Sequence, residues 1–192
     1  MRSAFPLFQS HLDFAHMLWR QHLEPGDVAI DATCGNGHDT LALAKRILPS
    51  GKLYALDIQK SALAAAKKLV EETLGKQDNI VYLLQDHETL PGEEEGVKLI
   101  VYNLGYLPGG DHSRTTQTPT TLRSIQNGLP LLAPGGALSI TCYPGHPEGA
   151  REEAALLSFA STLPPTHYNI CHHRFINRQN SPSLLLIQTP KN

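Results

Sequence analysis

The sequence contains little cysteine, no long apolar run and no excess of basic charge, and each shortage excludes a class of protein. Its three cysteines, Cys34, Cys142 and Cys171, are an odd number and form no Cys-x-x-Cys pair. This argues against a disulfide framework and fits a reducing compartment. No apolar run approaches the roughly 20 residues that cross a bilayer, and the N-terminus lacks the apolar segment of a secretory signal. We therefore expect a cytoplasmic protein with no membrane partner.

The formal net charge is −2, which excludes a basic, histone-like nucleic-acid binder. The charge is unevenly distributed along the chain. Residues 1–111 contain 10 Lys and Arg against 15 Asp and Glu (net −5), and residues 112–192 contain 6 against 3 (net +3). Two interpretations stay open: the asymmetry marks two faces, of which one is favourable to a polyanion, or it is chance in a small sample.

With 192 residues, 41% of them hydrophobic and 18% charged, the chain has the composition of a globular protein and is long enough to bury a full core. Disorder, collagen and coiled coil are excluded. We expect a single domain that spans residues 1–192.

Hydrophobic periodicity and turn residues predict strands that alternate with helices. Asp39 is expected to cap the second helix, and a turn at Pro134-Gly135-Gly136 is expected to lead into the fifth strand. The predicted helices lie near residues 10–23, 39–47, 61–74, 118–128 and 148–163. The predicted strands lie near residues 28–30, 52–56, 80–84, 97–102 and 137–141, followed by a closing hairpin near 167–189. Such alternation predicts an α/β, Rossmann-like fold with a mostly parallel sheet and helices on both faces.

Ligands of such sheets bind at the carboxyl ends of the strands, so the loops that follow the strands are the candidate sites. The first loop, residues 31–40, contains Gly35 and Gly37, which allow the backbone to approach a ligand closely. Thr40 stands where a dinucleotide-binding loop has its third glycine. Asp31 and Asp39 flank the glycines, and two carboxylates repel a diphosphate but accept hydrogen bonds from a cationic amino-acid end.

The next loops add acceptors and an aromatic ring. Asp57 ends the second strand, 22 residues beyond Gly35, where an acid binds the two hydroxyls of a ribose. The third loop contains Asp86 and His87, and Asp86 suits either the exocyclic amine of adenine or a helix N-cap. The fourth loop, residues 103–112, offers the Asn103 amide and the Tyr106 ring. Together the loops predict a pocket for an adenosine with a zwitterionic tail beside an acceptor site.

The segments DATCGNGHDT (31–40), ALDIQ (55–59), QDH (85–87) and NLGYLPGGDH (103–112) resemble the class I, S-adenosylmethionine-dependent methyltransferases. They resemble more closely a small bacterial group, once labelled putative rRNA methylases, of tRNA 5-aminomethyl-2-thiouridine methyltransferases (MnmM- or YtqB-like). The resemblance runs from about residue 11 to the final strand. It implies a sheet of seven strands, the last of which is antiparallel to the others.

The resemblance also implies which residues surround the cofactor, S-adenosylmethionine. Asn103 to Tyr106 stands where N-methyltransferases carry Asn-Pro-Pro-Tyr, but Leu104-Gly105 replaces the two prolines, so the mechanism of that motif does not transfer directly. The implied contacts are Asp31, Gly35, Asn36, Gly37 and Asp39 for the methionine part, Asp57 and Gln59 for the ribose, and Asp86 and His87 for the adenine, with Thr33, Cys34, Thr40, Ile58 and Asn103 completing the cofactor site.

The implied activity is methylation of the amine of 5-aminomethyl-2-thiouridine at the tRNA wobble position, U34. Asn103 and Tyr106 would position the acceptor, and Asp111 or His112 would hold the ammonium group or take its proton. Two alternatives stay open. One is a class I methyltransferase that acts on rRNA or on a small amine, and the other is a non-catalytic nucleotide or NAD-binding module, which Thr40 disfavours.

The expected partners are the anticodon stem-loop of tRNA and, from the resemblance, a second copy of the chain in a homodimer. Basic side chains near the site and in the acid-poor last part of the chain are the predicted RNA-binding residues: Arg114, Arg123, His172, His173, Arg174 and Arg178. We expect no metal at Cys171-His172-His173, because neighbouring residues of a strand point to opposite faces and no second Cys/His pair follows at zinc-finger spacing.

Overall fold

The computed structural model describes residues 10–91, 96–105 and 115–191, which contain seven strands, five α-helices and one short 3₁₀ helix. The strands are β1 (Val28–Asp31), β2 (Lys52–Asp57), β3 (Ile80–Leu84), β4 (Val97–Asn103), β5 (Leu132–Cys142), β6 (Asn169–His173) and β7 (Ser183–Gln188). The helices are α1 (His11–His22), α2 (His38–Ile47), α3 (Lys60–Leu74), α4 (Thr118–Gly128), α5 (Pro147–Thr162) and the 3₁₀ helix η1 (Leu129–Leu131).

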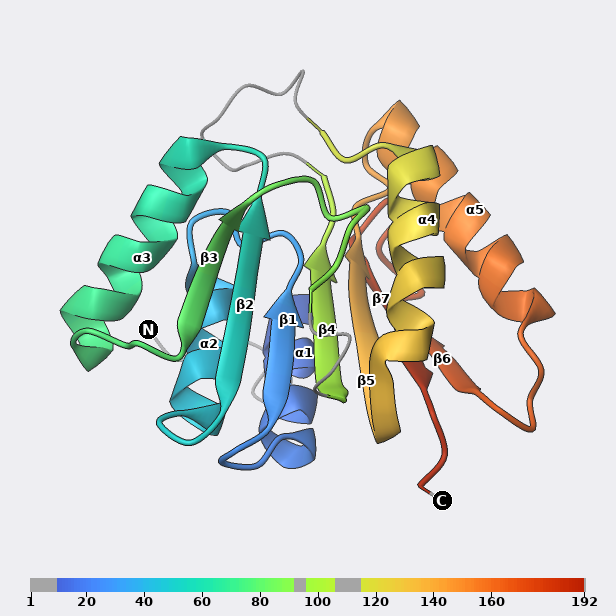
Figure 1. Ribbon diagram of the computed structural model, residues 1–192. Helices are drawn as coiled ribbons and strands as arrows, with labels where there is room; N and C mark the ends of the chain where they lie inside the picture. The colour runs from blue at the N-terminus through green and yellow to red at the C-terminus, as the bar shows by residue number, and fades with distance from the viewer. Residues whose placement is uncertain (1–9, 92–95, 106–114, 192) are drawn as a thin grey trace.

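All seven strands form one sheet in the order β3-β2-β1-β4-β5-β7-β6 (Figure 1). β1 pairs with β2 and β4 in parallel, β2 with β3 and β4 with β5 do the same, and β7 runs antiparallel to β5 and β6. The Rossmann-like sheet with an antiparallel last strand and a closing hairpin, as expected from the sequence, is confirmed.

The sheet separates two hydrophobic cores, because alternate residues of its central strands point to opposite faces. Ile30 and Ile100 are fully buried in the cluster that also contains Ile125 of α4 and Leu156 of α5. The neighbouring strand residues belong to the other cluster, which joins α1, α2 and α3 through Ala29, Leu99, Trp19, Leu43 and Val70. In Figure 1, α4 and α5 lie in front of the sheet, and α1 and α2 lie behind it.

Helix α1 is fixed both at its start and along its buried side. Ser10 caps it in a capping box, in which the Ser10 Oγ accepts a hydrogen bond from the Asp13 N–H while the Asp13 carboxylate accepts one from the Ser10 N–H. The Trp19 indole N–H donates to Ser139 Oγ of β5 at 2.8 Å. No helix in the described ranges is long and apolar enough to cross a bilayer.

Two local expectations from the sequence were wrong. The N-cap of α2 is Gly37, with φ +83° and no side-chain hydrogen bond, so Asp39 lies in the first turn and its carboxylate points to other partners. Strand β5 begins at Leu132, not at residue 137. Its Pro134-Gly135-Gly136 segment lies inside the strand, where the register against β4 shifts between Val97 and Leu99. A β-bulge there absorbs the extra residues.

Candidate active site

The glycine turn after β1 is shaped by its neighbours in β2 and α3. Gly35 and Gly37 have φ of +50° and +83°, a region that residues with a Cβ rarely adopt. A Cβ on Gly37 would lie 2.5 Å from the Ala66 Cα of α3. The Cys34 N–H donates to the Leu56 carbonyl at 2.8 Å. The turn is therefore held against β2 and α3, with its backbone at the carboxyl edge of the sheet.

Asp57, at the end of β2, has the environment that a ribose diol needs. Its carboxylate accepts hydrogen bonds from the Gly35 N–H at 3.0 Å and the Gln59 N–H at 2.8 Å, one on each oxygen. Each carboxylate oxygen keeps a further lone pair for a hydroxyl donor. Burial raises the pKa of Asp57, and the backbone hydrogen bonds oppose that rise. The next side chain, Ile58, is 54% exposed and offers an apolar surface for a planar ring.

Asp31 and Asp39 place two carboxylates in a nearly water-free part of the site. Asp31 is fully buried and accepts hydrogen bonds from the Thr40 hydroxyl at 2.6 Å and the Thr33 N–H at 3.3 Å. Burial, and then the negative charge of Asp39, raise the pKa of Asp31. A cation at this point relieves the repulsion, so the pair fits the ammonium end of an amino acid and opposes a pyrophosphate.

Asn103, at the end of β4, is connected to the glycine turn and to α2. Its N–H donates to Thr33 Oγ1 at 2.7 Å, and its side-chain Nδ2 donates to Asp39 Oδ2 at 3.1 Å. The other Asp39 oxygen lies 2.6 Å from His16 Nε2 of α1, in a hydrogen bond. Three elements far apart in the sequence thus fix the orientation of the Asn103 amide.

Tyr143, which follows β5 directly, borders the same amide. Its hydroxyl is hydrogen-bonded to the Asn103 side chain and lies 3.2 Å from His11 Nε2, and the His11 and Tyr143 rings meet edge to face at 5.4 Å. Burial raises the pKa of Tyr143 to about 12 and lowers the pKa of His11. At neutral pH the tyrosine is therefore protonated and the imidazole is neutral.

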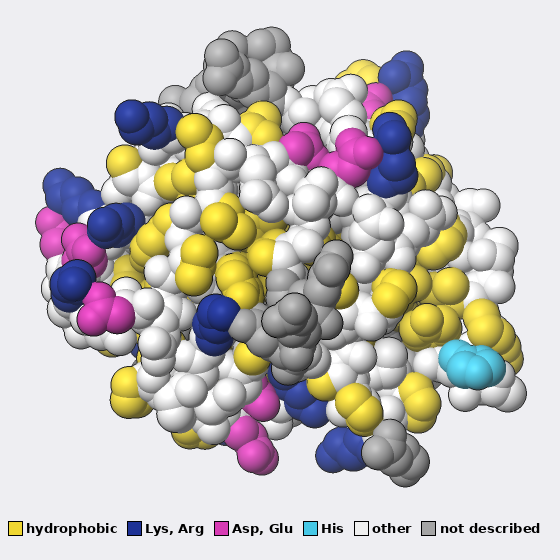
Figure 2. Space-filling model, in the orientation of Figure 1, with side chains coloured by type: hydrophobic (Ala, Val, Ile, Leu, Met, Phe, Trp, Pro, Cys, Tyr) yellow, Lys and Arg dark blue, Asp and Glu magenta, His cyan; other side chains and the backbone are white. Residues whose placement is uncertain are grey.

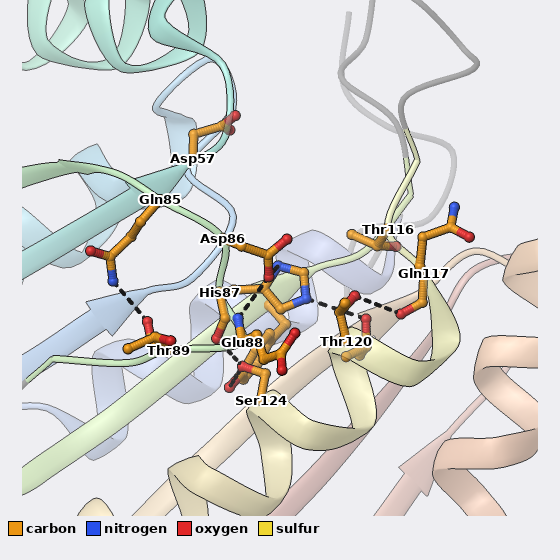
Figure 3. Close-up of polar contacts among 12 residues, drawn as sticks. Asp57, Gln85, Asp86, His87, Glu88, Thr89, Thr116, Gln117, Thr120 and Ser124 are labelled. Atoms are coloured by element: carbon orange, nitrogen blue, oxygen red, sulfur yellow. Dashed lines mark hydrogen bonds and ion pairs between the residues drawn. The ribbon is translucent and has the colours of Figure 1, made fainter.

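The loop after β3 packs against the first turns of α4, as Figure 3 shows. Asp86 accepts a hydrogen bond from the Glu88 N–H at 2.8 Å, which makes a tight turn, and its side chain is 48% exposed. His87 is buried, with Nε2 3.4 Å from Thr121 Oγ1, and burial lowers its pKa. Asp86 therefore keeps a partly exposed carboxylate, while His87 anchors the loop.

A buried glutamate on α5 connects the helices to the loop after β4. Glu152, 2% exposed, accepts hydrogen bonds from the hydroxyls of Thr121 at 2.5 Å and Thr116 at 2.9 Å. Thr116 in turn accepts the Gly105 N–H at 2.9 Å. Burial raises the pKa of Glu152. This network fixes the backbone immediately after Asn103.

Sequence reasoning missed His16, Tyr143 and Glu152. Tyr143 carries a signal that was available, because it follows a strand at the edge where the other site residues lie. His16 and Glu152 lie inside helices, and helical periodicity does not distinguish them from other polar residues.

The remaining predicted site residues are placed as follows. Cys34 is buried in the glycine turn, and burial raises the pKa of its thiol, so it is present as the unreactive protonated form. Asn36 is half-buried in the same turn, and Gln59 is the N-cap of α3. Tyr106, Asp111, His112 and Arg114 lie outside the described residues.

The structure gathers part of the predicted RNA-binding set. Three of these residues lie around Phe175 near the start of α1: His173, Arg174 and Arg178. A cavity of about 180 Å³ there is lined by His173, Arg174 and Phe175. The Arg178 guanidinium lies 4.4 Å from the centre of the Phe175 ring. His172 is 3.6 Å from Glu153, and Arg123 of α4 pairs at 3.2 Å with Glu88 of the loop after β3. Within the described ranges, no three His, Cys, Asp or Glu side chains gather as they would around a metal ion.

The sheet order, the glycine turn after β1, the acid that ends β2 and the asparagine that ends β4 define a class I methyltransferase, an enzyme that takes its methyl group from S-adenosylmethionine. The chain belongs to the family described as "Putative rRNA methylase", whose model matches residues 53–189.

Three relatives illustrate this membership. The tRNA (mnm(5)s(2)U34)-methyltransferase, chloroplastic, of Arabidopsis thaliana is 37% identical over 185 residues, which are 91% of this chain and 68% of that protein. A putative rRNA-methylase from Clostridium thermocellum is 30% identical, with a TM-score of 0.88 over 95% of this chain and 98% of that one. A putative methyltransferase from Streptococcus mutans, solved in complex with SAH, is 31% identical, with a TM-score of 0.82 over 95% and 99% of the two chains.

Proposed function

We propose that this chain transfers a methyl group from S-adenosylmethionine to the primary amine of 5-aminomethyl-2-thiouridine at the wobble position of tRNA. The name of the 37%-identical Arabidopsis thaliana relative supports the substrate. The observation that carries the proposal is the Asn103 amide at the end of β4, held between Asp39 and Tyr143 beside the glycine turn. An amide in that place suits an amine acceptor, because it offers both a hydrogen-bond donor and an acceptor.

The residues of the site fit the cofactor. Asp57 matches the ribose, Asp86 and Ile58 border the adenine side, and Asp31 with Asp39 matches the ammonium group. When bound, S-adenosylmethionine supplies an already electrophilic methyl group. The contribution of the protein is therefore chiefly to position the amine and exclude water.

The acceptor amine must be neutral to react, and one of its protons must leave. Asn103 orients the amine through its side-chain oxygen. Asp111 or His112 would hold the ammonium group or take its proton, and Tyr106 would help to position the acceptor.

The proposal includes recognition of the tRNA anticodon stem-loop by Arg114, Arg123, His172, His173, Arg174 and Arg178, and assembly as a homodimer. It also includes a cytoplasmic location, although the Arabidopsis thaliana relative is named as chloroplastic. The near-neutral net charge of −2 favours a modest, salt-sensitive affinity for RNA.

The experiment offers purified protein and labelled S-adenosylmethionine to three acceptors: tRNA that carries 5-aminomethyl-2-thiouridine, rRNA, and a small primary amine. Mass spectrometry of the digested nucleosides should show one added methyl group at the wobble uridine, and cells that lack the protein should accumulate the unmethylated nucleoside. If the methyl group is transferred only to rRNA or only to the free amine, that acceptor is the substrate and the tRNA assignment is wrong. Binding of NAD without binding of S-adenosylmethionine would refute the methyltransferase activity and favour an NAD-binding module.

A further inference from the structure

Helices α1 and α2 lie side by side on the face of the sheet opposite α4 and α5, and they enclose a groove with a volume of about 390 Å³. Its apolar floor includes Trp19 and Leu41. Arg20 of α1 and Lys45 and Arg46 of α2 line it, and His16 and His38 lie at its other end. We refer to this feature as the α1–α2 groove.

The α1–α2 groove is lined by three cations, Arg20, Lys45 and Arg46, and at its other end His16 is hydrogen-bonded to the Asp39 carboxylate. None of the described residues that line it is acidic. Arg20 and Lys45 are exposed and form no ion pair among the described residues. Arg46 Nε donates to the Leu23 carbonyl at 2.5 Å, which holds its guanidinium between the two helices. These cations gather in the part of the chain, residues 1–111, whose net charge is −5.

A simpler interpretation is that the cations stabilise helix ends, since Arg20 lies in the last turn of α1 and Lys45 and Arg46 in the last turn of α2. That effect accounts for each residue separately. It does not explain why the cation of α1 and the two cations of α2 line the same groove. On the face shown in Figure 2, the Lys and Arg side chains of the described residues are dispersed among acidic and other side chains.

One residue of the groove is connected by hydrogen bonds to the acceptor side of the proposed active site. His16 lines the groove and is hydrogen-bonded to Asp39, which accepts a hydrogen bond from Asn103. From His38 the groove follows α2, whose ten residues extend about 15 Å, to Lys45 and Arg46. A chain of negative groups that starts at the acceptor would therefore meet successive cations.

We propose that the α1–α2 groove binds the phosphate backbone of the RNA next to the nucleotide that is methylated. The inference rests on the proposed function for the identity of the polyanion. Arginine binds phosphate through its fork of N–H donors and lysine through a point charge. The groove is a site distinct from Arg174 and Arg178, which lie at the opposite end of α1 near Phe175.

The test is the double charge reversal Arg20→Glu with Lys45→Glu, compared with Lys67→Glu with Lys68→Glu on α3. The control changes the net charge equally at exposed lysines that pair with Glu71 and Glu72 on their own helix. We expect the groove variant to weaken tRNA binding by about tenfold or more, and to reduce the slope of log K against log salt by about 2. The control should change the affinity by less than about threefold, and both variants should bind S-adenosylmethionine as the wild type does.

Unchanged tRNA affinity and salt slope in a folded groove variant would overturn the inference and leave the helix-end interpretation. If the charge reversal prevents folding, Arg20→Gln with Lys45→Gln gives the same comparison with smaller expected losses. The two proposals fail differently. If the wild-type protein binds tRNA through the groove but does not methylate it, the proposed function is refuted. If the wild type methylates tRNA and the groove variant binds tRNA equally well, the RNA-binding role of the groove is refuted.

Discussion

The Asn103 side-chain amide donates a hydrogen bond to Asp39 at 3.1 Å and so connects the end of β4 to the first turn of α2. The same carboxylate is hydrogen-bonded to His16. In the proposed function, the amide that orients the acceptor is therefore held by a carboxylate of α2 that is assigned to the cofactor. The proposal thus makes cofactor binding and acceptor positioning depend on neighbouring side chains, and variants can separate the two.

Replacing Asn103 tests the acceptor role. Asn103→Ala should reduce turnover by about 100-fold or more, because an amine that is no longer oriented misses the reactive geometry. The affinity for S-adenosylmethionine should change by less than about threefold. Kinetics and calorimetry measure the two effects, with Asn127→Ala, an exposed asparagine on α4, as the control. Equal losses in turnover and affinity would place Asn103 on the cofactor side.

Replacing Asp57 tests the ribose role. Asp57→Ala should weaken cofactor binding by roughly 100-fold or more, since two hydrogen bonds to a charged group contribute about 3 kcal/mol together. Its backbone donors Gly35 and Gln59 lie in a loop at the sheet edge, so we expect the variant to unfold cooperatively. An unchanged affinity by calorimetry would contradict the assignment.

The raised pKa of Asp31 predicts a pH dependence of cofactor binding. The ammonium group requires the ionised carboxylate, so wild-type affinity should rise as the pH increases through this raised pKa. Asp31→Asn should be weaker throughout and should lose the dependence. Calorimetry between pH 5 and pH 8 measures both, and a wild-type affinity that stays flat would exclude ionisation of Asp31 as the cause.

The same variant should have the opposite effect on stability. A carboxyl whose folded pKa is raised contributes stability at low pH that is lost as the pH rises through the folded pKa. Asp31→Asn should therefore stabilise the cofactor-free protein by about 1–3 kcal/mol at pH 8 and by less at pH 5. Urea unfolding at both values provides the measurement.

The buried Glu152 network should matter mainly for stability. Glu152→Ala leaves the hydroxyls of Thr116 and Thr121 without their acceptor, and we expect a loss of about 2–4 kcal/mol in the free energy of unfolding. Glu152→Gln keeps an accepting oxygen and should lose less than half of that. Glu71→Ala, on the exposed side of α3, is the control. Similar losses in the alanine and glutamine variants would refute the hydrogen-bond explanation.

The cations near Phe175 should affect RNA binding alone. Arg174→Glu with Arg178→Glu should weaken tRNA binding by about tenfold and leave cofactor affinity unchanged, because each lost phosphate contact removes part of the salt-dependent binding. Filter binding or fluorescence anisotropy at two salt concentrations measures the effect. If the tRNA affinity does not move, these arginines lie outside the RNA interface.

The sequence predicted the ligand edge of the sheet because that prediction requires only that parallel strands end at the same side. Asp57 was assigned to the ribose in this way, and that role stays a prediction; its hydrogen bond to Gly35 spans 22 residues. The pairs that complete the site depend on how helices and loops pack over the sheet. Asn103 meets Asp39 across 64 positions, and His11 meets Tyr143 across 132. Local periodicity carries no information on such distances, and the wrong assignment of Asp39 as a cap shows the same limit.

A Cβ at Gly37 would lie 2.5 Å from the Ala66 Cα and 2.8 Å from the Ala66 Cβ, so a side chain at position 37 would displace α3 from the turn. The form of the cofactor loop is thus enforced by a helix whose own sequence contains no recognisable signature. A relative that keeps every letter of the loop but carries a bulky residue at the equivalent of Ala66 would possess the motif without its shape. Whether a relative shares this activity is therefore better judged from the residues at the positions of Gly37 and Ala66 together than from the loop sequence alone.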